Sequence, residues 1–391
     1  MSMRGNKLKM LTDSNMRLAI YIPSLRGGGA ERVMVILANG FAERGYEVDL
    51  VLAKAEGPYL KEVADTVRVV DLKSTRVLTS LPGLVRYLRS VRPLALLSAM
   101  GHANVVAVVA KVLARVPTRV VVSERNNFSV SKKHARSHRA NAMGRLILMR
   151  WAYRRAAGVI AISGGVADDL SVQLEIPRDN IKVVYNPLDI ERAQVLSRLE
   201  PTRIFSDGNG HKLILGIGRL VEQKGFIHLI RAFAQVRSGS SVKLCILGEG
   251  PLRESLKAEV ERLGLINEIV LPGFVGNPFA VMRQANLFVL SSGWEGFGNV
   301  LVEAMACGTP VVSTACPSGP DEILEQGRWG RLVPVGDVDA LAAAMAETLD
   351  ENEHPDVATR AGEFSVDRAV EGYLEVMLMG SKEWQPQMSG S

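Results

Sequence analysis

Two glutamates eight residues apart, Glu295 and Glu303, stand in a stretch with apolar flanks, SSGWEGFGNVLVEAMACGTPVV. The preceding LFVLSS predicts a buried strand, GWEGFGN a loop, and VLVEAMA the beginning of a helix. Glu295 is therefore expected in the loop. Glu303 is expected about two turns further on, in a helix that is otherwise apolar from Val300 to Ala306.

A buried carboxylate without a partner is costly, so Glu303 requires hydrogen-bond donors. No lysine, arginine or histidine lies beside it in the sequence. Two vicinal hydroxyls, such as the diol of a ribose, would satisfy it, and Glu295 could accept hydrogen bonds from the hydroxyls of a sugar. The backbone of the loop would face the same ligand, at Phe297, Gly298, Asn299 and Val300. The structural alternative is a helix-capping Glu295 and a salt-bridged Glu303.

A second loop, GIGRLVEQKGF, carries positive charge directly after a predicted strand. Arg219 and Lys224 are five residues apart, and Gly218 lets the backbone open toward a ligand. An arginine fork and a mobile lysine charge together suit a diphosphate. Two solvated surface charges would give the same pattern, but the place at a strand end favours binding.

Three consecutive glycines, Gly27, Gly28 and Gly29, connect another predicted strand to a helix in SLRGGGAER. Glycine lets backbone approach a ligand closely, and a helix N-terminus offers unpaired N–H groups to an anion. The stretch matches neither the GxGxxG nor the P-loop pattern. A tight turn that packs the helix on a sheet is the structural alternative.

Two further strand-end loops offer backbone groups. LGEGPLRE contains Gly250, and PGFVGN contains Phe274 and Val275. The exposed backbone of PGFVGN could hydrogen-bond the edge of a nucleobase, and an ordinary turn explains each of the two loops equally well.

Apolar runs that alternate with segments of helical period position these loops. They predict strands at 17–23, 47–53, 67–72, 93–99, 119–124, 158–163 and 181–186, and then at 212–219, 243–250, 268–274, 287–292, 310–314 and 330–337. The alternation predicts an α/β fold of two doubly wound, Rossmann-like domains that face one another across a cleft. Such sheets bind ligands outside the carboxyl ends of their strands.

Composition agrees with a folded chain of two domains: 391 residues, of which 47% are hydrophobic and 23% charged. The three cysteines, Cys245, Cys307 and Cys316, lack metal-ligand spacing and are interpreted as buried thiols in a reducing compartment. The polar, basic residues 1–16 lack the apolar stretch of a secretory signal, and no run approaches the length of a membrane span. A cytoplasmic location is expected.

Together these motifs resemble those of the retaining GT-B glycosyltransferases of family 4, from Arg17 to about Tyr373. The strongest mark is the Glu-x7-Glu pair, and GIGRLVEQKGF, LGEGP, YNPLD and SLRGGGAERV fit the same pattern. SLRGGGAERV, SERNN and CPSGPDEIL are most similar to members that build lipid-linked oligosaccharides and surface polysaccharides in bacteria. Those members often use UDP-hexoses or UDP-N-acetylhexosamines.

The resemblance implies roles for the two domains. The expected division is a flexible leader at 1–16, an acceptor-binding domain at 17–190, a linker at 191–211, a nucleotide-sugar-binding domain at 212–365, and, at 366–391, a helix that packs back toward the N-terminal domain and a tail.

It also implies roles for the loop residues. Glu303 would hold the ribose, and Glu295 the donor sugar near its 3-hydroxyl. Arg219 and Lys224 would neutralise the diphosphate leaving group in place of a metal ion, with no cofactor. The loop Gly27–Gly29 would face the donor phosphate and the acceptor from the other domain. The anomeric configuration would be kept because the leaving phosphate takes the acceptor proton on the same face.

One departure from the family pattern concerns a histidine that many relatives place after an N-terminal strand. Here Arg125 stands in the comparable region, VVVSERNN, and the nearest histidine is His102 in SAMGHAN. His102 is a candidate catalytic residue and Arg125 a candidate phosphate contact, with a structural role open for both.

Positive charge gathers between residues 125 and 167, which contain nine lysines and arginines and no acidic residue. Within this stretch, 131–158 mixes cations with apolar and aromatic residues, as a segment lying in a headgroup layer does. The hypothesis is a peripheral position on the anionic inner face of the plasma membrane, beside a polyprenyl-diphosphate-linked acceptor. A solvated helix that covers its own domain is the alternative.

The predicted function is transfer of a hexose or N-acetylhexosamine from a nucleotide-diphospho-sugar, a UDP-sugar foremost, to a lipid-linked or polysaccharide-precursor acceptor. The alternative enzyme is a UDP-sugar 2-epimerase of the same fold, which needs no acceptor. Nucleic acid is not an expected partner, because the chain lacks aromatic stacking motifs and zinc spacing and because such a role leaves Glu303 unexplained.

Overall fold

The computed structural model describes residues 16–129, 139–200, 210–236 and 241–379. Parts of four predicted segments lie outside the described residues: most of the leader, 130–138 of the basic stretch, 201–209 of the linker, and 380–391 of the tail.

The described residues of the N-terminal half form a parallel sheet of seven strands, in the order β3-β2-β1-β4-β5-β6-β7. The strands are β1 (Arg17–Ile22), β2 (Glu47–Leu52), β3 (Val67–Asp71), β4 (Ala95–Ala99), β5 (Arg119–Glu124), β6 (Gly158–Ala161) and β7 (Ile181–Val183). Neighbours β1 and β2 pair in register from Arg17 with Glu47 to Ile22 with Leu52. Most of these strands are apolar on both faces because helices cover both sides of the sheet.

Alternate side chains of β1 enter two different cores. Leu18, Ile20 and Ile22 pack with one set of helices, and Ala19 and Tyr21 with the other. The first set is α1 (Gly29–Glu43) and α15 (Val366–Leu378), and the second is α2 (Leu81–Val91), α3 (Gly101–Ala114) and α5 (Arg139–Tyr153). The period of two in β1 thus decides which layer each residue supports.

Asp49 on β2 is a fully buried carboxylate in this half of the protein. It accepts hydrogen bonds from Arg17 Nη1 at 3.0 Å, from Arg68 Nε at 2.8 Å and from the Tyr87 hydroxyl at 2.7 Å. Burial, followed by the bond to Asp49, holds the pKa of Tyr87 far above its usual value. We call these four residues the Asp49 cluster.

The described residues of the C-terminal half form a second parallel sheet, of six strands in the order β10-β9-β8-β11-β12-β13. The strands are β8 (Lys212–Ile217), β9 (Val242–Leu247), β10 (Ile269–Gly273), β11 (Leu287–Leu290), β12 (Val311–Thr314) and β13 (Arg331–Val333). One face packs against α8 (Phe226–Val236), α9 (Arg253–Arg262) and α13 (Val338–Asp350). The other face packs against α10 (Pro278–Gln284), α11 (Asn299–Ala306), α12 (Pro320–Ile323) and α14 (Val357–Ala361).

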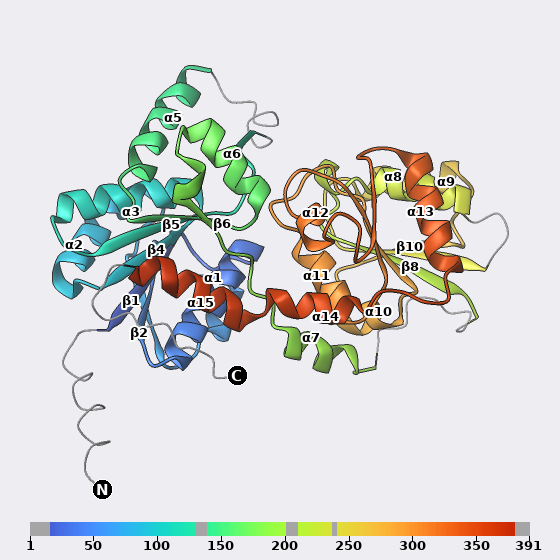
Figure 1. The fold of residues 1–391 in the computed structure, drawn as a ribbon, viewed down its shortest axis with the longest axis horizontal. Coiled ribbons are helices and arrows are strands. Elements are labelled where there is room, and N and C mark those ends of the chain that lie inside the picture. The colour runs from blue at the N-terminus through green and yellow to red at the C-terminus, as the bar shows by residue number, and fades with distance from the viewer. Residues whose placement is uncertain (1–15, 130–138, 201–209, 237–240, 380–391) are drawn as a thin grey trace, which may run out of the picture.

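The chain passes twice between the two sheets. The first passage follows β7 and leads to α7 (Ile190–Ser197), which packs against α10 and α11, so that part of the predicted linker is a helix. The second passage follows α14 and leads to α15, which returns to α1 and to β4, β5 and β6 (Figure 1). The two passages lie side by side, because the Leu188 N–H donates to the Phe364 carbonyl at 2.8 Å.

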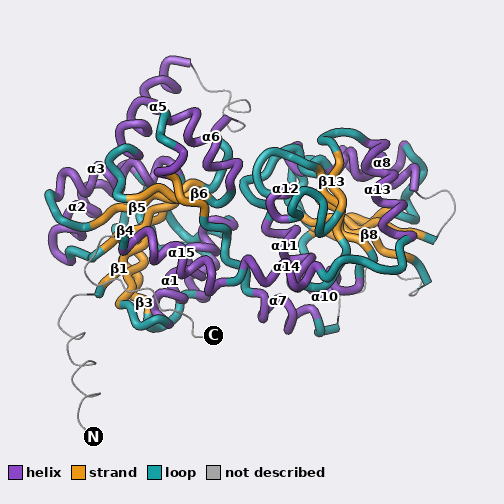
Figure 2. The backbone as a smooth tube through the Cα atoms, in the orientation of Figure 1, coloured by secondary structure: helices purple, strands orange, loops and turns teal. Residues whose placement is uncertain are grey.

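The two-domain α/β architecture predicted from the sequence is confirmed. Each apolar run that predicts a strand forms one, with ends that differ by a few residues (Figure 2).

Candidate active site

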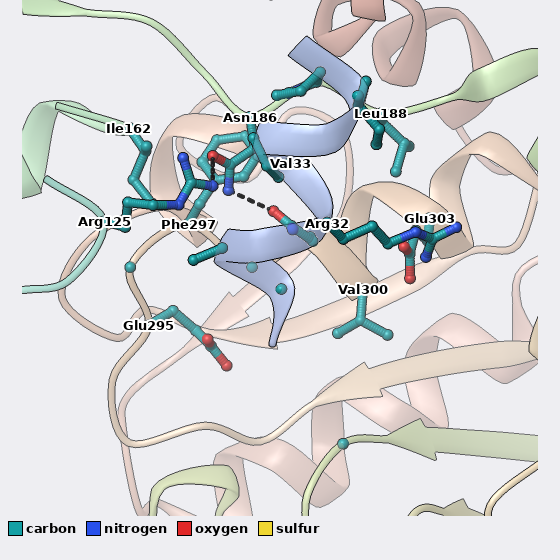
Figure 3. A pocket seen from close by; sticks show the side chains of 18 of the residues that line it. Arg32, Val33, Arg125, Ile162, Asn186, Leu188, Glu295, Phe297, Val300 and Glu303 are labelled. Atoms are coloured by element: carbon teal, nitrogen blue, oxygen red, sulfur yellow. Dashed lines mark hydrogen bonds between the residues drawn. The ribbon is translucent and has the colours of Figure 1, made fainter. Parts of the chain in front are cut away.

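A cavity of about 480 Å³ lies between the two domains. Its walls come from segments that follow β1, β5, β6, β8 and β11, together with the first interdomain passage and α11 (Figure 3). The carboxyl ends of both sheets therefore meet there, as expected for doubly wound domains. The predicted residues that line it are Gly29, Arg125, Gly218, Arg219, Lys224, Glu295, Phe297, Gly298, Asn299, Val300 and Glu303.

The loop between β11 and α11, residues 291–298, needs its glycines because backbone approaches it closely. A Cβ atom on Gly296 would lie 2.3 Å from the carbonyl oxygen of Arg125 in the other domain. Gly298 has a φ of +105°, which a residue with a side chain rarely adopts, and it begins α11 without a side-chain cap. We call this segment the Glu295 loop.

Glu295 is 7% exposed and pairs with the predicted diphosphate cation. Its Oε1 accepts from Lys224 Nζ at 2.6 Å and from the Ser292 hydroxyl at 2.6 Å. Since the N-cap of α11 is Gly298, Glu295 does not cap that helix, and the capping alternative is wrong. In this structure the positive charge of Lys224 is thus balanced by a carboxylate at the cavity wall.

We call residues 218–225, between β8 and α8, the Lys224 loop. Besides the Lys224–Glu295 contact, three hydrogen bonds among the described residues join this loop to the Glu295 loop. The Ser291 hydroxyl donates to the Lys224 carbonyl at 2.8 Å, and Gln223 Nε2 donates to the Trp294 carbonyl at 2.8 Å. The Gly293 N–H donates to the Gln223 carbonyl at 2.7 Å. These bonds hold the lysine and the glutamate in one rigid unit, while Arg219 is exposed at the cavity edge.

Glu303 projects from α11 into the cavity, and burial raises the pKa of its carboxyl. The positive charge of Arg32 on α1 partly opposes this rise, and Arg32 reaches across from the other domain toward Glu303 (Figure 3). No lysine or arginine of the described residues forms an ion pair with Glu303 within 4.0 Å. The Nε of Arg32 is buried without a hydrogen-bond partner, and its only described ion-pair contact, to Glu62 Oε2, spans 4.0 Å. The donors and acceptors at this end of the cavity are therefore incompletely satisfied within the described part of the chain.

Arg125 is 6% exposed and stands on the opposite wall. Its Nη2 donates to Asn186 Oδ1 at 2.6 Å, and its Nη1 is buried without a hydrogen-bond partner among the described residues. Burial lowers the pKa of the Arg125 guanidinium and raises that of the neighbouring Glu124, which accepts from the Tyr153 hydroxyl at 2.7 Å. Arg125 is thus an incompletely paired buried cation beside the cavity.

The two walls also touch directly. Glu322 of the C-terminal domain accepts from the N–H groups of Gly164 at 2.7 Å and Gly165 at 3.0 Å, at the beginning of α6 (Gly164–Leu174). The Ser163 hydroxyl donates to the Gly296 carbonyl at 2.9 Å. These bonds connect the Glu295 loop and α12 to the N-terminal domain.

Two family models divide the chain between them. The model described as Glycosyltransferase Family 4 matches residues 27–192, and the model described as Glycosyl transferases group 1 matches residues 203–363. The chain belongs to the family 4 glycosyltransferases. The expected GT-B fold is likewise confirmed by solved structures of similar architecture.

Individual relatives of this glycosyltransferase span nearly its whole length. A Campylobacter jejuni N-acetylgalactosamine-N,N'-diacetylbacillosaminyl-diphospho-undecaprenol 4-alpha-N-acetylgalactosaminyltransferase is 29% identical over 347 residues, 86% of this chain and 91% of that protein. The lipopolysaccharide core biosynthesis glycosyltransferase LpsE of Rhizobium meliloti is 25% identical over 364 residues, 90% of this chain and 96% of that protein. The structure of Anabaena Alr3699/HepE in complex with UDP has a TM-score of 0.75 and 24% identity, and covers 92% of this chain and 99% of that one.

Several residues predicted for the site of the glycosyltransferase do not line the cavity. They are His102, Gly27, Gly28, Gly250, Phe274 and Val275. His102 is an exposed residue in the first turn of α3, and desolvation lowers its pKa. Phe274 is 82% exposed. Any contact of these residues with a ligand stays a prediction.

Sequence reasoning did not single out Arg32 and Asn186, which do line the cavity. Both lie in stretches that carry the family resemblance, SLRGGGAERV and YNPLD. The motifs therefore contained the signal, but only the packing of the two domains reveals which atoms the side chains meet.

Neither a membrane span nor a metal centre is evident in the described ranges. No helix there is both long and apolar enough to cross a bilayer. No cluster of three or more histidine, cysteine or acidic residues is arranged there to hold a metal ion.

Proposed function

We propose that this glycosyltransferase transfers a hexose or N-acetylhexosamine from a UDP-sugar, with retention of the anomeric configuration, to a lipid-linked or polysaccharide-precursor acceptor. The observation that carries the proposal is the interdomain cavity in which the Lys224–Glu295 pair and the part-buried Glu303 occur together. Support for the donor comes from HepE, which was crystallised with UDP. Support for the acceptor comes from the Campylobacter relative, whose name specifies an undecaprenol-linked substrate.

In this proposal the C-terminal domain holds the donor. The diol of the ribose donates two hydrogen bonds to Glu303, which lines the cavity, is part-buried and has no ion-pair partner among the described residues. The diphosphate lies against Arg219 and Lys224, which supply positive charge at the strand end in place of a metal ion. Glu295 accepts from a hydroxyl of the donor sugar and keeps Lys224 oriented at 2.6 Å.

The chemistry follows from this charge arrangement. The acceptor oxygen forms a bond to the anomeric carbon while the bond from that carbon to the β-phosphate oxygen breaks. The departing diphosphate takes the acceptor proton on the same face, so the configuration is retained. Lys224 and Arg219 stabilise the negative charge that develops on the leaving group, and removal of one such donor typically lowers kcat by about 10²–10³.

The N-terminal domain supplies the acceptor wall. The open N-terminus of α1, at Gly29, and the buried Arg125 line this side of the cavity. Both suit an anionic group such as the diphosphate of a polyprenyl carrier.

A membrane-facing surface accompanies this acceptor. On α5, Ile147 and Leu148 are 59% and 44% exposed, next to exposed cations. On the neighbouring α3, Val112 and Leu113 are also exposed. Apolar side chains among arginines suit an anionic bilayer surface, where each cation contributes about 1 kcal/mol. The exposed cations are Arg145 on α5 and, directly after the end of this helix, Arg154 and Arg155.

Donor screening tests the proposed reaction. Purified protein is incubated with UDP-glucose, UDP-galactose, their N-acetylated forms and GDP-mannose, each with a short polyprenyl-diphosphate-linked sugar. We expect transfer from a UDP-sugar, with the product anomer identified by the NMR coupling of its anomeric proton. An inverted product, or transfer from GDP-mannose only, would contradict the proposal.

Two controls test the 2-epimerase alternative and the membrane-facing surface. The family models favour a transferase over the 2-epimerase, and the donor without acceptor should give slow hydrolysis at most, whereas an epimeric UDP-sugar would support the epimerase. Sedimentation with anionic vesicles at low salt should be lost in an Ile147→Asp/Leu148→Asp variant. Equal binding of wild type and variant would remove the membrane-facing surface from the proposal.

A further inference from the structure

Asn186 connects the two walls of the cavity through its side-chain amide. It lies on the first interdomain passage and is 5% exposed. Its Oδ1 accepts from Arg125 Nη2 at 2.6 Å, and its Nδ2 donates to Asn299 Oδ1 at 2.7 Å (Figure 3). One amide therefore joins the carboxyl end of β5 to the first residue of α11.

The chemistry of the three side chains fixes the direction of this connection. A guanidinium has donors only, so the Asn186 oxygen must face Arg125 and its amino group must face Asn299. Asn299 then accepts through its Oδ1. Its amino group, Nδ2, takes no part in the hydrogen bonds to Asn186. Because Asn299 lines the cavity, this amino group is a donor for a ligand there.

Aromatic residues of the two interdomain passages contact Phe297, which lies on the other side of Gly298 from Asn299. Tyr185 stacks on Phe297 with ring centroids 5.4 Å apart, and Phe364 of the second passage meets Phe297 edge-on at 5.4 Å. Phe297 and Asn299 flank Gly298, whose φ of +105° is a backbone conformation that a residue with a side chain rarely adopts. The interdomain passages thus hold the Glu295 loop on both sides of that glycine.

We infer that Asn186 is a positioning residue: it orients Asn299 and the first turn of α11 from the interdomain passage, through the connection Arg125–Asn186–Asn299. As a statement about catalysis this inference rests on the proposed function. Asn186 acts on the sugar end of the cavity, and Glu303 stands a full turn further along α11, so nucleotide affinity depends little on it.

Hydrogen exchange tests the connection without any substrate. In Asn186→Leu the amide is absent, and we expect the peptide covering residues 297–303 to exchange about tenfold faster than in the wild type. The matched control is Asn39→Leu on α1. Asn39 also makes two hydrogen bonds, donating to the Glu62 carbonyl and accepting from the Ala64 N–H, but it does not line the cavity. Exchange of 297–303 within twofold of the wild type would overturn the inference.

A double-mutant cycle tests the catalytic part. We expect Asn186→Leu and Asn299→Ala each to lower kcat about 10–100-fold, with the Kd for UDP changed less than threefold. If one residue acts through the other, the double variant loses no more than the larger single loss. Losses that multiply would refute the positioning role.

A second variant covers the case in which Asn186→Leu folds poorly. Asn186→Asp keeps an acceptor for Arg125, and the new negative charge balances that of the guanidinium. Because a carboxylate only accepts, Asn299 must turn its amino group toward it. We expect a stable protein with reduced kcat, and unchanged kcat would overturn the inference. Absence of transfer in the wild type would refute the proposed function instead, and hydrogen exchange would still decide the role of Asn186.

Discussion

Replacing Glu303 by glutamine should change stability and nucleotide affinity in opposite directions. Burial raises the pKa of the Glu303 carboxyl above its ordinary 4.5, and Arg32 offsets part of the rise. In the pH range between the unfolded and folded pKa values the native state binds more protons, so stability falls as the pH increases. Above that range the ionised Glu303 carboxylate lowers the free energy of unfolding of the ligand-free protein by an amount that no longer depends on pH. Glu303→Gln should therefore unfold at a higher temperature than the wild type at pH 7.5, and the difference should shrink toward pH 4.5.

Affinity for the nucleotide should fall in the same variant. A hydrogen bond to a charged acceptor contributes about 1.5–3 kcal/mol. Glutamine keeps one acceptor oxygen but loses the charge, so a loss of about that size raises the Kd for UDP roughly 10–150-fold. Isothermal titration with UDP measures the affinity, and thermal unfolding between pH 4.5 and 8 measures the stability.

A matched control removes a carboxylate that has no place in the cavity. Glu254 on α9 has a side chain that is 80% exposed, and Glu254→Gln should change neither quantity. Lower stability of Glu303→Gln at pH 7.5, combined with unchanged UDP affinity, would refute the reasoning. Glu303 would then be a member of a structural ion pair.

Three further substitutions test the remaining electrostatics. Lys224→Met removes the cation beside Glu295 and should lower kcat about 10²–10³-fold, as measured by UDP release; a loss below threefold would argue against leaving-group stabilisation by Lys224. Arg32→Ala removes the charge that lowers the pKa of Glu303, so that the decline of UDP affinity on acidification should begin at a higher pH, and superimposable profiles from pH 5 to 8 would contradict it. Asp49→Asn unpairs the part-exposed arginines of the Asp49 cluster and should lower the free energy of unfolding by about 1–3 kcal/mol in urea titrations, without changing UDP affinity.

The architecture could be predicted because its determinants are local in the sequence. Continuous apolar runs mark strands covered on both faces, and helical periods mark the connections between them. The Glu295 loop and the Lys224 loop were found in the same way, since each follows a strand whose end must reach the ligand edge of its sheet.

Contacts between the domains could not be predicted, because they depend on how two separately folded sheets meet. Arg32 and Glu303 are distant in sequence, and no periodicity relates them. Asn186 reads as an ordinary turn residue before proline until its amide is seen between Arg125 and Asn299. The Lys224–Glu295 pair lies within one domain, but the sequence does not predict it either, because the two motifs assign these residues to different parts of one ligand.

The return of α15 to the first domain has a consequence for engineering chimaeras. The N-terminal domain does not correspond to one uninterrupted piece of the gene, because α15 belongs to it. A fragment that stops before Val366 would therefore expose the apolar surface that Val370, Tyr373 and Met377 cover. Exchange of the C-terminal domain between relatives therefore needs two junctions, one near Leu188 and one near Ser365, where an isolated β-bridge already pairs the two passages. Recombination at a single point would combine the N-terminal domain of one parent with the α15 of the other parent, although α15 packs on that domain.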